Sequence, residues 1–487
     1  MPDSPNDSLP QLTPTQPLTH RLNEPTIVGL ATALGPAGVA VLRVSGVQAW
    51  AIVDACFSRS LTQAEPLKAL FGYIQTVEGE ALDQVLVLPF KAPASFTGED
   101  VVEIHCHGGS YLPQALLNRV QEAGAVLAQR GEFSKRAVLN GKLDLTQAES
   151  ILDMVHAEGE ALASVALNNL KTQGLRQQLL ALREPLMEVQ ANLIAAMDYP
   201  EEVEEPNRPQ TVAQLQALRQ TALAWAGSAQ QHKVYSEGLK LAILGQPNAG
   251  KSSLFNALLA NNRSIVTDIA GTTRDVVSER FTLHGLPMTL VDTAGIRQHT
   301  SDTVEQLGIK RSLQAGQEAD VILYVVDATV AWEHNGLPPA DATILNQLPP
   351  HTPKVLLLNK QDALNPSHLN ELLHQLPQDV ATPWLPLSLV MQHGMDALQQ
   401  ALKTTLQQAT GTLQESRLCL NQRQAQCMHA MAEHIALATD TFQTEAFPLD
   451  LATVPLSDAL YELDKLLGMD TTEATLDVVF SRFCVGK

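Results

Sequence analysis

The sequence predicts a multidomain protein with an α+β N-terminal domain, an all-α helical domain, and an inserted α/β P-loop domain whose sheet is mostly parallel. Three observations predict this architecture. A chain of 487 residues is too long for one hydrophobic core. A G-x-x-x-x-G-K-S sequence follows a short apolar run, as in a strand–loop–helix phosphate site. Ala-, Leu- and Gln-rich segments with helical periodicity occur on both sides of it.

Shifts in composition set the domain boundaries. Residues 1–24 are rich in Pro, Ser, Thr, Asn and Gln and lack the apolar core of a signal peptide, so they are predicted to be a disordered tail. Residues 25–142 are the N-terminal domain, and residues 238–410 are the inserted domain. Residues 143–237 and 411–487 are then the two parts of the helical domain, because an insertion is tolerated where the ends of the guest lie close together.

Short apolar runs punctuated by glycine and proline predict strands in the N-terminal domain, at residues 39–44, 85–88 and 101–104. A helix is predicted from Leu145 to about Met197, and Thr146 and Glu149 have the spacing of a capping box. The acidic stretch between Pro200 and Pro209 is predicted to break this helix as a solvated linker, and residues 211–235 resume the helical pattern.

Composition excludes some classes of protein. The formal net charge of −20 argues against a surface that binds nucleic acid non-specifically, although a local basic groove remains compatible with it. No apolar run approaches the roughly 20 residues that span a bilayer, so no membrane span is predicted.

The five cysteines are scattered and contain no C-x-x-C pair, which predicts free thiols and a cytoplasmic location. A zinc site at His105-Cys106-His107 is disfavoured because neighbouring residues on a strand point to opposite faces.

The phosphate loop runs from Gly245 to Ser252, between the apolar residues 239–244 and a predicted helix. Its glycines let backbone N–H groups turn toward phosphate oxygens, and the helix N-terminus adds its dipole. Lys251 is predicted to reach the β- and γ-phosphates, and the Ser252 hydroxyl to bind Mg²⁺. A chance glycine turn is the alternative for this loop alone, and two further motifs weaken it.

The first of these motifs is D-x-x-G at residues 292–295, directly after an apolar run. Asp292 can hold the Mg²⁺ shell, and the Gly295 N–H can meet the γ-phosphate. In Ras-like GTPases a glutamine follows and orients the attacking water, but this chain has Ile296, which cannot form that hydrogen bond. Arg274 and Arg297 flank this region, although surface arginines are more often solvated charges than arginine fingers.

The second motif is N-K-x-D at residues 359–362, again after an apolar run. The Asp362 carboxylate can accept from the N1–H and the 2-amino group of guanine, and adenine offers neither donor. Asn359 and Lys360 are predicted to brace the base site. Ser388 follows a later apolar stretch, with Leu389 where GTPases usually carry alanine. Motifs at the ends of several strands predict a nucleotide at the carboxyl edge of a parallel sheet.

Several motifs together resemble the MnmE (TrmE) family of tRNA-modification GTPases, and the resemblance covers everything after about residue 25. The motifs that carry it are the phosphate loop, D-I-A-G-T-T-R-D at 268–275, C-V-G-K at 484–487, and N-terminal blocks at 40–46, 95–100, 107–109, 131–134 and 141–149.

The resemblance implies K⁺-activated GTP hydrolysis in place of the glutamine mechanism. It implies K⁺ ligands at Asn248, Thr267, Ile269 and Thr272, and Mg²⁺ ligands at Ser252 and Thr273. Glu305 matches the catalytic glutamate that orients water, with one extra residue between it and Gly295. The complete implied GTP-binding set is Asn248, Ala249, Gly250, Lys251, Ser252, Ser253, Thr267, Asp268, Ile269, Ala270, Gly271, Thr272, Thr273, Asp292, Thr293, Ala294, Gly295, Asn359, Lys360, Asp362 and Ser388.

The resemblance also implies a folate-binding N-terminal domain that forms a homodimer. Reduced folate (5-formyl- or methylene-tetrahydrofolate) would contact Arg43, Glu103, Lys142 and Lys487, because cations suit its glutamate tail and a carboxylate suits its pterin donors. Ordinary surface charges are the alternative for the first three. Cys484 is implied as a catalytic thiol, and a buried inert cysteine is the alternative.

The function implied is a GTPase that works on tRNA in a heterotetramer with the FAD-dependent protein MnmG. Together they would install an aminomethyl-type group at C5 of the wobble uridine, U34, from a tetrahydrofolate one-carbon unit. The alternative is a regulatory or assembly GTPase without one-carbon chemistry. The N-terminal blocks and the C-terminal C-V-G-K favour the first function.

Overall fold

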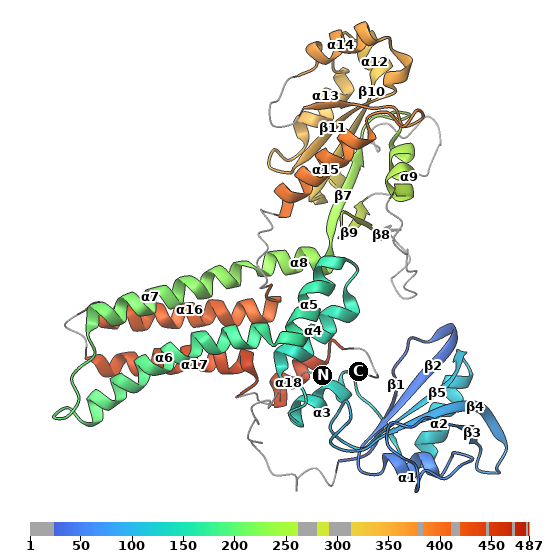
Figure 1. The fold of residues 1–487 in the computed structure, drawn as a ribbon. Coiled ribbons are helices and arrows are strands. Elements are labelled where there is room, and N and C mark those ends of the chain that lie inside the picture. Colours follow the sequence, from blue (N-terminus) through green and yellow to red (C-terminus); the bar gives the residue numbers. More distant parts are fainter. Residues whose placement is uncertain are drawn as a thin grey trace, which may run out of the picture. The chain divides into compact units, whose positions relative to one another are not determined.

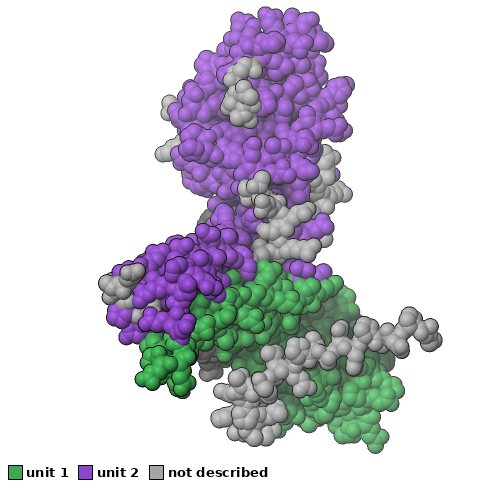
Figure 2. Space-filling view, turned by 60° about the vertical axis from the view of Figure 1, so that its left-hand side comes forward, with its two compact units in different colours: residues 1–152, 169–203, 456–487 green, residues 153–168, 204–455 purple. Residues whose placement is uncertain are grey.

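The computed structural model describes residues 24–261, 280–291, 313–377, 383–410, 419–444, 448–469, 473–483 and 486. The chain forms two compact units, which are coloured separately in Figure 2. Unit 1 contains residues 1–152, 169–203 and 456–487, and unit 2 contains residues 153–168 and 204–455. Each unit therefore combines segments that are distant in the sequence. Among the described helices, none has both the length and the apolar character needed to cross a membrane.

Unit 1 contains a six-stranded sheet (Figure 1). Its strands are β1 (Ile27–Leu30), β2 (Gly35–Ser45), β3 (Leu70–Gln75), β4 (Ala81–Phe90), β5 (Val101–Gly109) and β6 (Val126–Leu127). The order is β3-β4-β5-β2-β1-β6, antiparallel except between β1 and β6. Helices α1 (Ala49–Asp54) and α2 (Leu112–Glu122) pack against the sheet over a core that buries alternate strand residues such as Val85 and Val87. The predicted α+β fold of this domain is confirmed.

Alternation along β5 explains why His105, Cys106 and His107 do not converge. Cys106 is buried in the core, whereas His107 is exposed on the other face and its Nδ1 lies 2.7 Å from Asp83 Oδ1. Burial raises the pKa of the Cys106 thiol to about 11. Over the described ranges, no group of three His, Cys, Asp or Glu side chains is arranged to hold a metal ion. Free, buried thiols are found at Cys56, Cys106, Cys419 and Cys427, and Cys484 lies outside the described residues.

The C-terminal segment packs into the N-terminal part of unit 1. Helices α3 (Glu132–Leu139), α4 (Leu145–His156) and α18 (Glu473–Phe480) meet there, and Leu145 and Ala148 share a core with Phe480 and Phe483. Gly131 is the N-cap residue of α3 with φ +66°, and a Cβ on it would lie 2.7 Å from the Phe480 carbonyl oxygen. This contact explains why only glycine fits at position 131.

The N-terminal cap of α4 differs from the prediction. Asp144 Oδ1 accepts hydrogen bonds from the Gln147 N–H at 2.8 Å and from the Thr146 hydroxyl, and the Gln147 side chain accepts from the Asp144 N–H. The capping box is therefore formed by Asp144 and Gln147, and the predicted pair of Thr146 and Glu149 is wrong. Both predicted residues lie inside the helix and are buried.

The single helix predicted from Leu145 to Met197 is also wrong, because the chain forms α4, α5 (Glu160–Thr172) and α6 (Gly174–Asp198). Gln173 separates the last two with a left-handed φ of 50°. In unit 1, α6 pairs with α17 (Thr453–Leu467), and Arg183 Nε lies 2.6 Å from Asp464 Oδ1. In unit 2, α7 (Arg208–Gly227) and α8 (Ala229–Glu237) are followed much later by α16 (Gln422–Gln443), which packs along α7, and by the short η3 (Leu449–Ala452).

The inserted domain in unit 2 is built on the predicted, mostly parallel sheet. Its strands are β7 (Leu239–Leu244), β8 (Arg280–Leu283), β9 (Leu286–Val291), β10 (Val321–Asp327), β11 (Lys354–Asn359) and β12 (Trp384–Pro386). The order is β12-β11-β10-β7-β9-β8, and only the β8–β9 pair is antiparallel. Two buried clusters flank the sheet, under α9 (Lys251–Asn261), α12 (Ala328–Glu333), α13 (Pro339–Gln347), α14 (Pro366–Gln375) and α15 (Met395–Thr410).

Gly131→Ala is expected to destabilise unit 1 by about 3 kcal/mol or more, because the new methyl group would add a clash with Phe480 to the left-handed strain. Gly141→Ala is the matched control, since Gly141 has φ +68° and no heavy atom within 4 Å of an added Cβ. The control should cost only about 1–2 kcal/mol of backbone strain. Scanning calorimetry of the two variants checks this, and equal losses of Tm would contradict a steric role for Gly131.

Candidate functional site

The phosphate loop connects β7 to α9 at the carboxyl edge of the parallel sheet. Gly245 (φ +140°) and Gly250 (φ +106°) take conformations that side chains avoid. A Cβ on Gly245 would lie 2.1 Å from the Val325 carbonyl oxygen, and one on Gly250 would lie 2.1 Å from Asn359 Nδ2. Both glycines are therefore required by close contacts with β10 and β11. Asn248, between them, has a left-handed φ of 62° and is exposed.

Lys251 folds back over its own loop. Its Nζ donates to the carbonyl oxygens of Gly245 and Gln246, at 2.8 Å in each case. The ammonium group is thus held at the mouth of the loop, where a phosphate group would be bound. Ser252 and Ser253 follow in the first turn of α9, and Ala249 is buried beneath the loop.

Asn359 joins the phosphate loop to the N-K-x-D motif. Its side chain is buried, and its Nδ2 donates to the Ala249 carbonyl oxygen at 2.8 Å. Its Oδ1 accepts from the Leu389 N–H at 3.4 Å, a long hydrogen bond. A single amide therefore links the phosphate loop, the end of β11 and the loop after β12.

Lys360 and Asp362 lie in the turn that follows β11. Lys360 has a left-handed φ of 64°, and its Nζ lies 2.6 Å from Asp327 Oδ2 at the end of β10. Asp362 is exposed in the short 3₁₀ turn η2 (Gln361–Ala363). The structure thus places both residues at the edge of the sheet that carries the phosphate loop.

Ser388 is fully buried, and its hydroxyl accepts a hydrogen bond from the Met391 N–H at 3.1 Å. This contact shapes the loop after β12. Leu389, which replaces the usual alanine, packs its side chain against the core of the domain and lies 3.6 Å from an added Cβ at Gly250. The longer side chain is therefore accommodated in a half-buried position against this core.

Two carboxylates near this site were not singled out by the sequence motifs. Asp327 caps α12 and pairs with Lys360; burial acts to raise its pKa, but hydrogen bonds from Lys360 and Thr329 lower it overall. Asp341 on α13 is buried and accepts from the Tyr324 hydroxyl at 2.9 Å. Burial raises the pKa of Asp341, while Tyr324 and the Lys251 ammonium act against that shift. The position of Asp327 directly after an apolar run was the available signal.

The remaining predicted nucleotide residues lie outside the described residues. These are Thr267, Asp268, Ile269, Ala270, Gly271, Thr272, Thr273, Asp292, Thr293, Ala294, Gly295 and Glu305. The described β9 ends at Val291, whose register partner on β7 is Ala242. Strand β9 is parallel to β7 and therefore ends at the edge of the sheet that carries the phosphate loop.

A second group of predicted residues lies in unit 1. Arg43 and Glu103 are register partners on β2 and β5, and Glu103 Oε1 accepts from Arg43 Nε at 3.0 Å and from Nη2 at 2.8 Å. The Arg43 guanidinium carbon also lies 4.8 Å from the centre of the Phe96 ring and 5.8 Å from that of Phe133. The predicted cation and carboxylate are thus brought together beside two aromatic rings.

Lys142 lies beside the loop that carries Phe96, since a Cβ on Gly98 would be 3.0 Å from Lys142 Cγ. The C-terminal segment reaches the same part of unit 1. A Cβ on Gly29 would lie 3.1 Å from the Phe133 ring and 3.3 Å from Gly486 Cα. Two further predicted residues, Cys484 and Lys487, lie outside the described residues.

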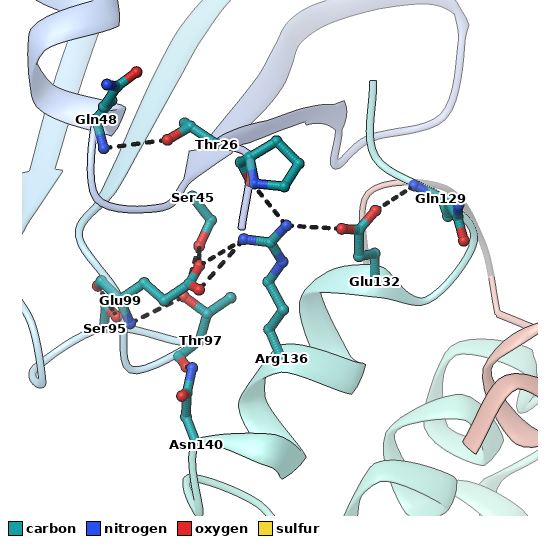
Figure 3. Close-up of polar contacts among 11 residues, drawn as sticks. Thr26, Ser45, Gln48, Ser95, Thr97, Glu99, Gln129, Glu132, Arg136 and Asn140 are labelled. Atoms are coloured by element: carbon teal, nitrogen blue, oxygen red, sulfur yellow. Dashed lines mark hydrogen bonds and ion pairs between the residues drawn. The ribbon is translucent and has the colours of Figure 1, made fainter. Parts of the chain in front are cut away.

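Arg136 on α3 organises the polar network in this region (Figure 3). It is 4% exposed. Its Nη1 donates to both carboxylate oxygens of Glu99, at 3.3 and 3.2 Å, and its Nη2 donates to the Pro25 carbonyl oxygen and to Glu132 Oε1. One buried cation therefore binds the loop before β5, the entry to β1 and its own helix.

The network extends through short side chains. Ser45 donates to Glu99 Oε2 at 2.7 Å, and its hydroxyl lies 2.7 Å from that of Thr97. Asn140 Nδ2 donates to the Thr97 carbonyl oxygen at 2.6 Å (Figure 3). Residues of the sequence blocks 40–46, 95–100 and 131–134 therefore meet here, together with Asn140, which precedes the block 141–149. The sequence motifs do not identify Arg136 as the residue that joins these blocks.

Comparisons with known proteins cover both sites. The family model described as "GTP-binding protein TrmE N-terminus" matches residues 26–142, and that described as "MnmE helical domain" matches residues 145–484. The chain is 38% identical over 462 residues to a Thermotoga maritima protein named "tRNA modification GTPase MnmE", covering 95% of this chain and 100% of the relative. Proteins of the same name from Synechococcus sp. (strain JA-3-3Ab) and Prochlorococcus marinus (strain MIT 9303) are 39% and 40% identical, over 95% and 97% of this chain and 98% and 100% of theirs.

Arg136→Met is expected to destabilise the N-terminal part of unit 1 by about 3–5 kcal/mol, because it leaves Glu99 and Glu132 without their buried cation. Lys91→Met is the control: it removes an ion pair of 2.6 Å to Asp100, but the lysine is 57% exposed, so the loss should stay below about 1 kcal/mol. Hydrogen–deuterium exchange of β1 and α3 measures both. A loss from Arg136→Met no larger than the control's would refute the organising role.

Proposed function

Because the chain belongs to the MnmE family of tRNA modification GTPases, we propose that its GTPase is K⁺-activated and serves modification of C5 of the wobble uridine, U34. The protein is a GTP hydrolase that acts in tRNA modification. The observation that carries the proposal is that one chain contains both a nucleotide site at a parallel sheet edge and a second site around Arg43 and Glu103.

The nucleotide site supports binding of GTP with its ions. Lys251 lies at the mouth of the phosphate loop, and Ser252 lies at the start of α9, where a hydroxyl can serve Mg²⁺. Asn248 is exposed in the loop with a left-handed φ that asparagine tolerates, and its side-chain oxygen is a possible ligand for K⁺. The cations would offset the negative charge that develops on the phosphates. Asp362 would accept from guanine, which selects GTP.

In the proposed mechanism, Thr267, Ile269 and Thr272 would help to hold K⁺, and Thr273 would join Ser252 in holding Mg²⁺. Glu305 would orient the attacking water. The Ile296 side chain cannot take that last role.

The second site supports reduced-folate binding. Arg43 and Glu103 offer opposite charges beside the Phe96 and Phe133 rings, a combination suited to a flat heteroaromatic ring with a charged tail. Lys142 and Lys487 would add cations for the glutamate tail, and Cys484 would supply a thiol. In this proposal the homodimer works in the cytoplasm with the FAD-dependent partner MnmG on tRNA, and the folate supplies the one-carbon unit.

GTP turnover is expected to fall by about tenfold or more when Na⁺ replaces K⁺ at constant ionic strength, because the smaller ion does not fit the same oxygen cage. Asn248→Gly should lose most of this response, since it removes the side-chain oxygen while glycine accepts the φ of 62°. Asn248→Asp keeps the oxygen and is the matched control. Steady-state phosphate release measures all three proteins, and equal rates in both salts would refute K⁺ activation.

Arg43→Ala is expected to weaken binding of 5-formyl-tetrahydrofolate by about tenfold or more, because it removes the cation between Glu103 and Phe96. Wobble-uridine modification should fall with it, while GTP turnover stays at the wild-type level. Arg59→Ala is the control. Arg59 is an exposed arginine of the same domain, and its Nη1 donates to the Phe71 carbonyl oxygen at 3.2 Å.

Calorimetry and mass spectrometry of tRNA nucleosides from cells that carry each variant give the two measurements. Normal U34 in cells without the protein would refute the function. Normal U34 with Arg43→Ala would instead favour a GTPase without one-carbon chemistry at this site.

A further inference from the structure

Asp327 ends β10 beside the N-K-x-D turn, and neither the sequence motifs nor the family resemblance assigns it a role. We propose that Asp327 is a positioning residue for guanine recognition, which holds Lys360 and, through Lys360, the turn that carries Asp362. The inference rests on the guanine site proposed above and adds a residue on a different strand to it.

Sheet geometry places Asp327 where it can act on this turn. Strands β10 and β11 are parallel neighbours, and Asp327 is the register partner of Asn359. Lys360 is the next residue along the chain, at the first position beyond the strand. Because parallel strands end at the same edge of the sheet, the last carboxylate of β10 faces the start of the N-K-x-D turn.

The two oxygens of Asp327 have separate partners. Oδ1 accepts from the Thr329 N–H at 2.9 Å and from the Thr329 hydroxyl at 2.7 Å, which caps α12. Oδ2 accepts from Lys360 Nζ at 2.6 Å. The cap fixes the orientation of the carboxylate group, so Oδ2 is directed at the lysine. The Asp327 side chain is 13% exposed and the Lys360 side chain is 40% exposed, so water screens this pair in part.

Lys360 controls the turn through its backbone. It holds a left-handed φ of 64°, which is uncommon for a residue with a side chain. Its carbonyl oxygen accepts from the Ala363 N–H at 3.0 Å, and this hydrogen bond encloses Asp362. The ion pair to Asp327 anchors the Lys360 side chain, so it restricts the residue that sets the direction of Asp362. A freed lysine would let the exposed Asp362 carboxylate sample other positions.

Asp327→Asn separates these two roles. Asparagine is as good a helix cap as aspartate, so α12 should keep its cap, while the charge that attracts Lys360 is lost. The informative measurement is the ratio of affinities for GTP and inosine triphosphate, because inosine lacks the 2-amino group that Asp362 would bind. We expect this ratio to fall by about three- to tenfold, in the lower part of the range of coupling between contacting residues.

Two further variants complete the experiment. Thr329→Val removes a hydroxyl donor from Oδ1 without touching the pair to Lys360, so it should keep the wild-type ratio. Lys360→Met should lower the ratio by itself, and adding Asp327→Asn to it should cause no further change. Equilibrium titration with fluorescent nucleotide and unlabelled competitors measures the affinities of every variant, and circular dichroism verifies that each one is folded.

Three outcomes would overturn the inference. Asp327→Asn could lower the affinities for GTP and inosine triphosphate equally, its effect could add in full to that of Lys360→Met, or Thr329→Val could reproduce it. In each case Asp327 is only a helix cap. Asp362→Asn distinguishes this from failure of the guanine site itself. A switch of that variant to xanthosine triphosphate retains the guanine site, whereas unchanged GTP affinity overturns both proposals.

Discussion

The hydrogen bond from Asn359 to the Ala249 carbonyl oxygen is the contact on which the nucleotide site depends. It joins a loop that follows β7 to a motif that follows β11, although 110 residues separate them in the chain. The contact is possible because Gly250 has no side chain. A Cβ at this position would lie only 2.1 Å from Asn359 Nδ2. Besides its place in the phosphate loop, Gly250 therefore permits the two halves of the site to approach each other.

In the N-terminal domain, a buried charge, rather than an amide, joins segments that are distant in the sequence. Arg136 is desolvated, and such a cation is tolerated in a protein interior only when carboxylates and carbonyl oxygens surround it. Its partners, Glu99, Glu132 and the Pro25 carbonyl oxygen, come from three segments. Arg43 lies on β2, and its guanidinium carbon is 4.8 Å from the centre of the Phe96 ring. Phe96 belongs to the loop before β5, which Arg136 binds through Glu99. The network thus sets the position of one wall of the second site.

Sequence reasoning was most successful where chemistry is local. A phosphate loop needs its glycines and lysine within eight residues, so the motif and its flanking strand and helix could be predicted together. The capping box at α4 was misplaced because Thr146 and Glu149 match the spacing, while Asp144, two residues earlier, competes better for the free N–H groups. The pairing of Arg136 with Glu99 could not be predicted, because both charges look like surface residues until the fold buries them. Asp327 could not be predicted for a related reason, because its ion pair with Lys360 forms only when β10 and β11 lie side by side.

The contact of α18 with Gly131 also has a consequence for the order in which the protein folds. Leu145 and Ala148 share their core with Phe480 and Phe483, and Lys135 forms an ion pair with Asp477. Lys135 and Asp477 are 342 residues apart in the chain, and a ribosome adds about 5–20 residues per second. The N-terminal segment of unit 1 therefore emerges about 17–70 s before the helix that completes its packing. During translation the inserted domain, made in between, can finish its own sheet while the domain that began first still exposes an apolar surface.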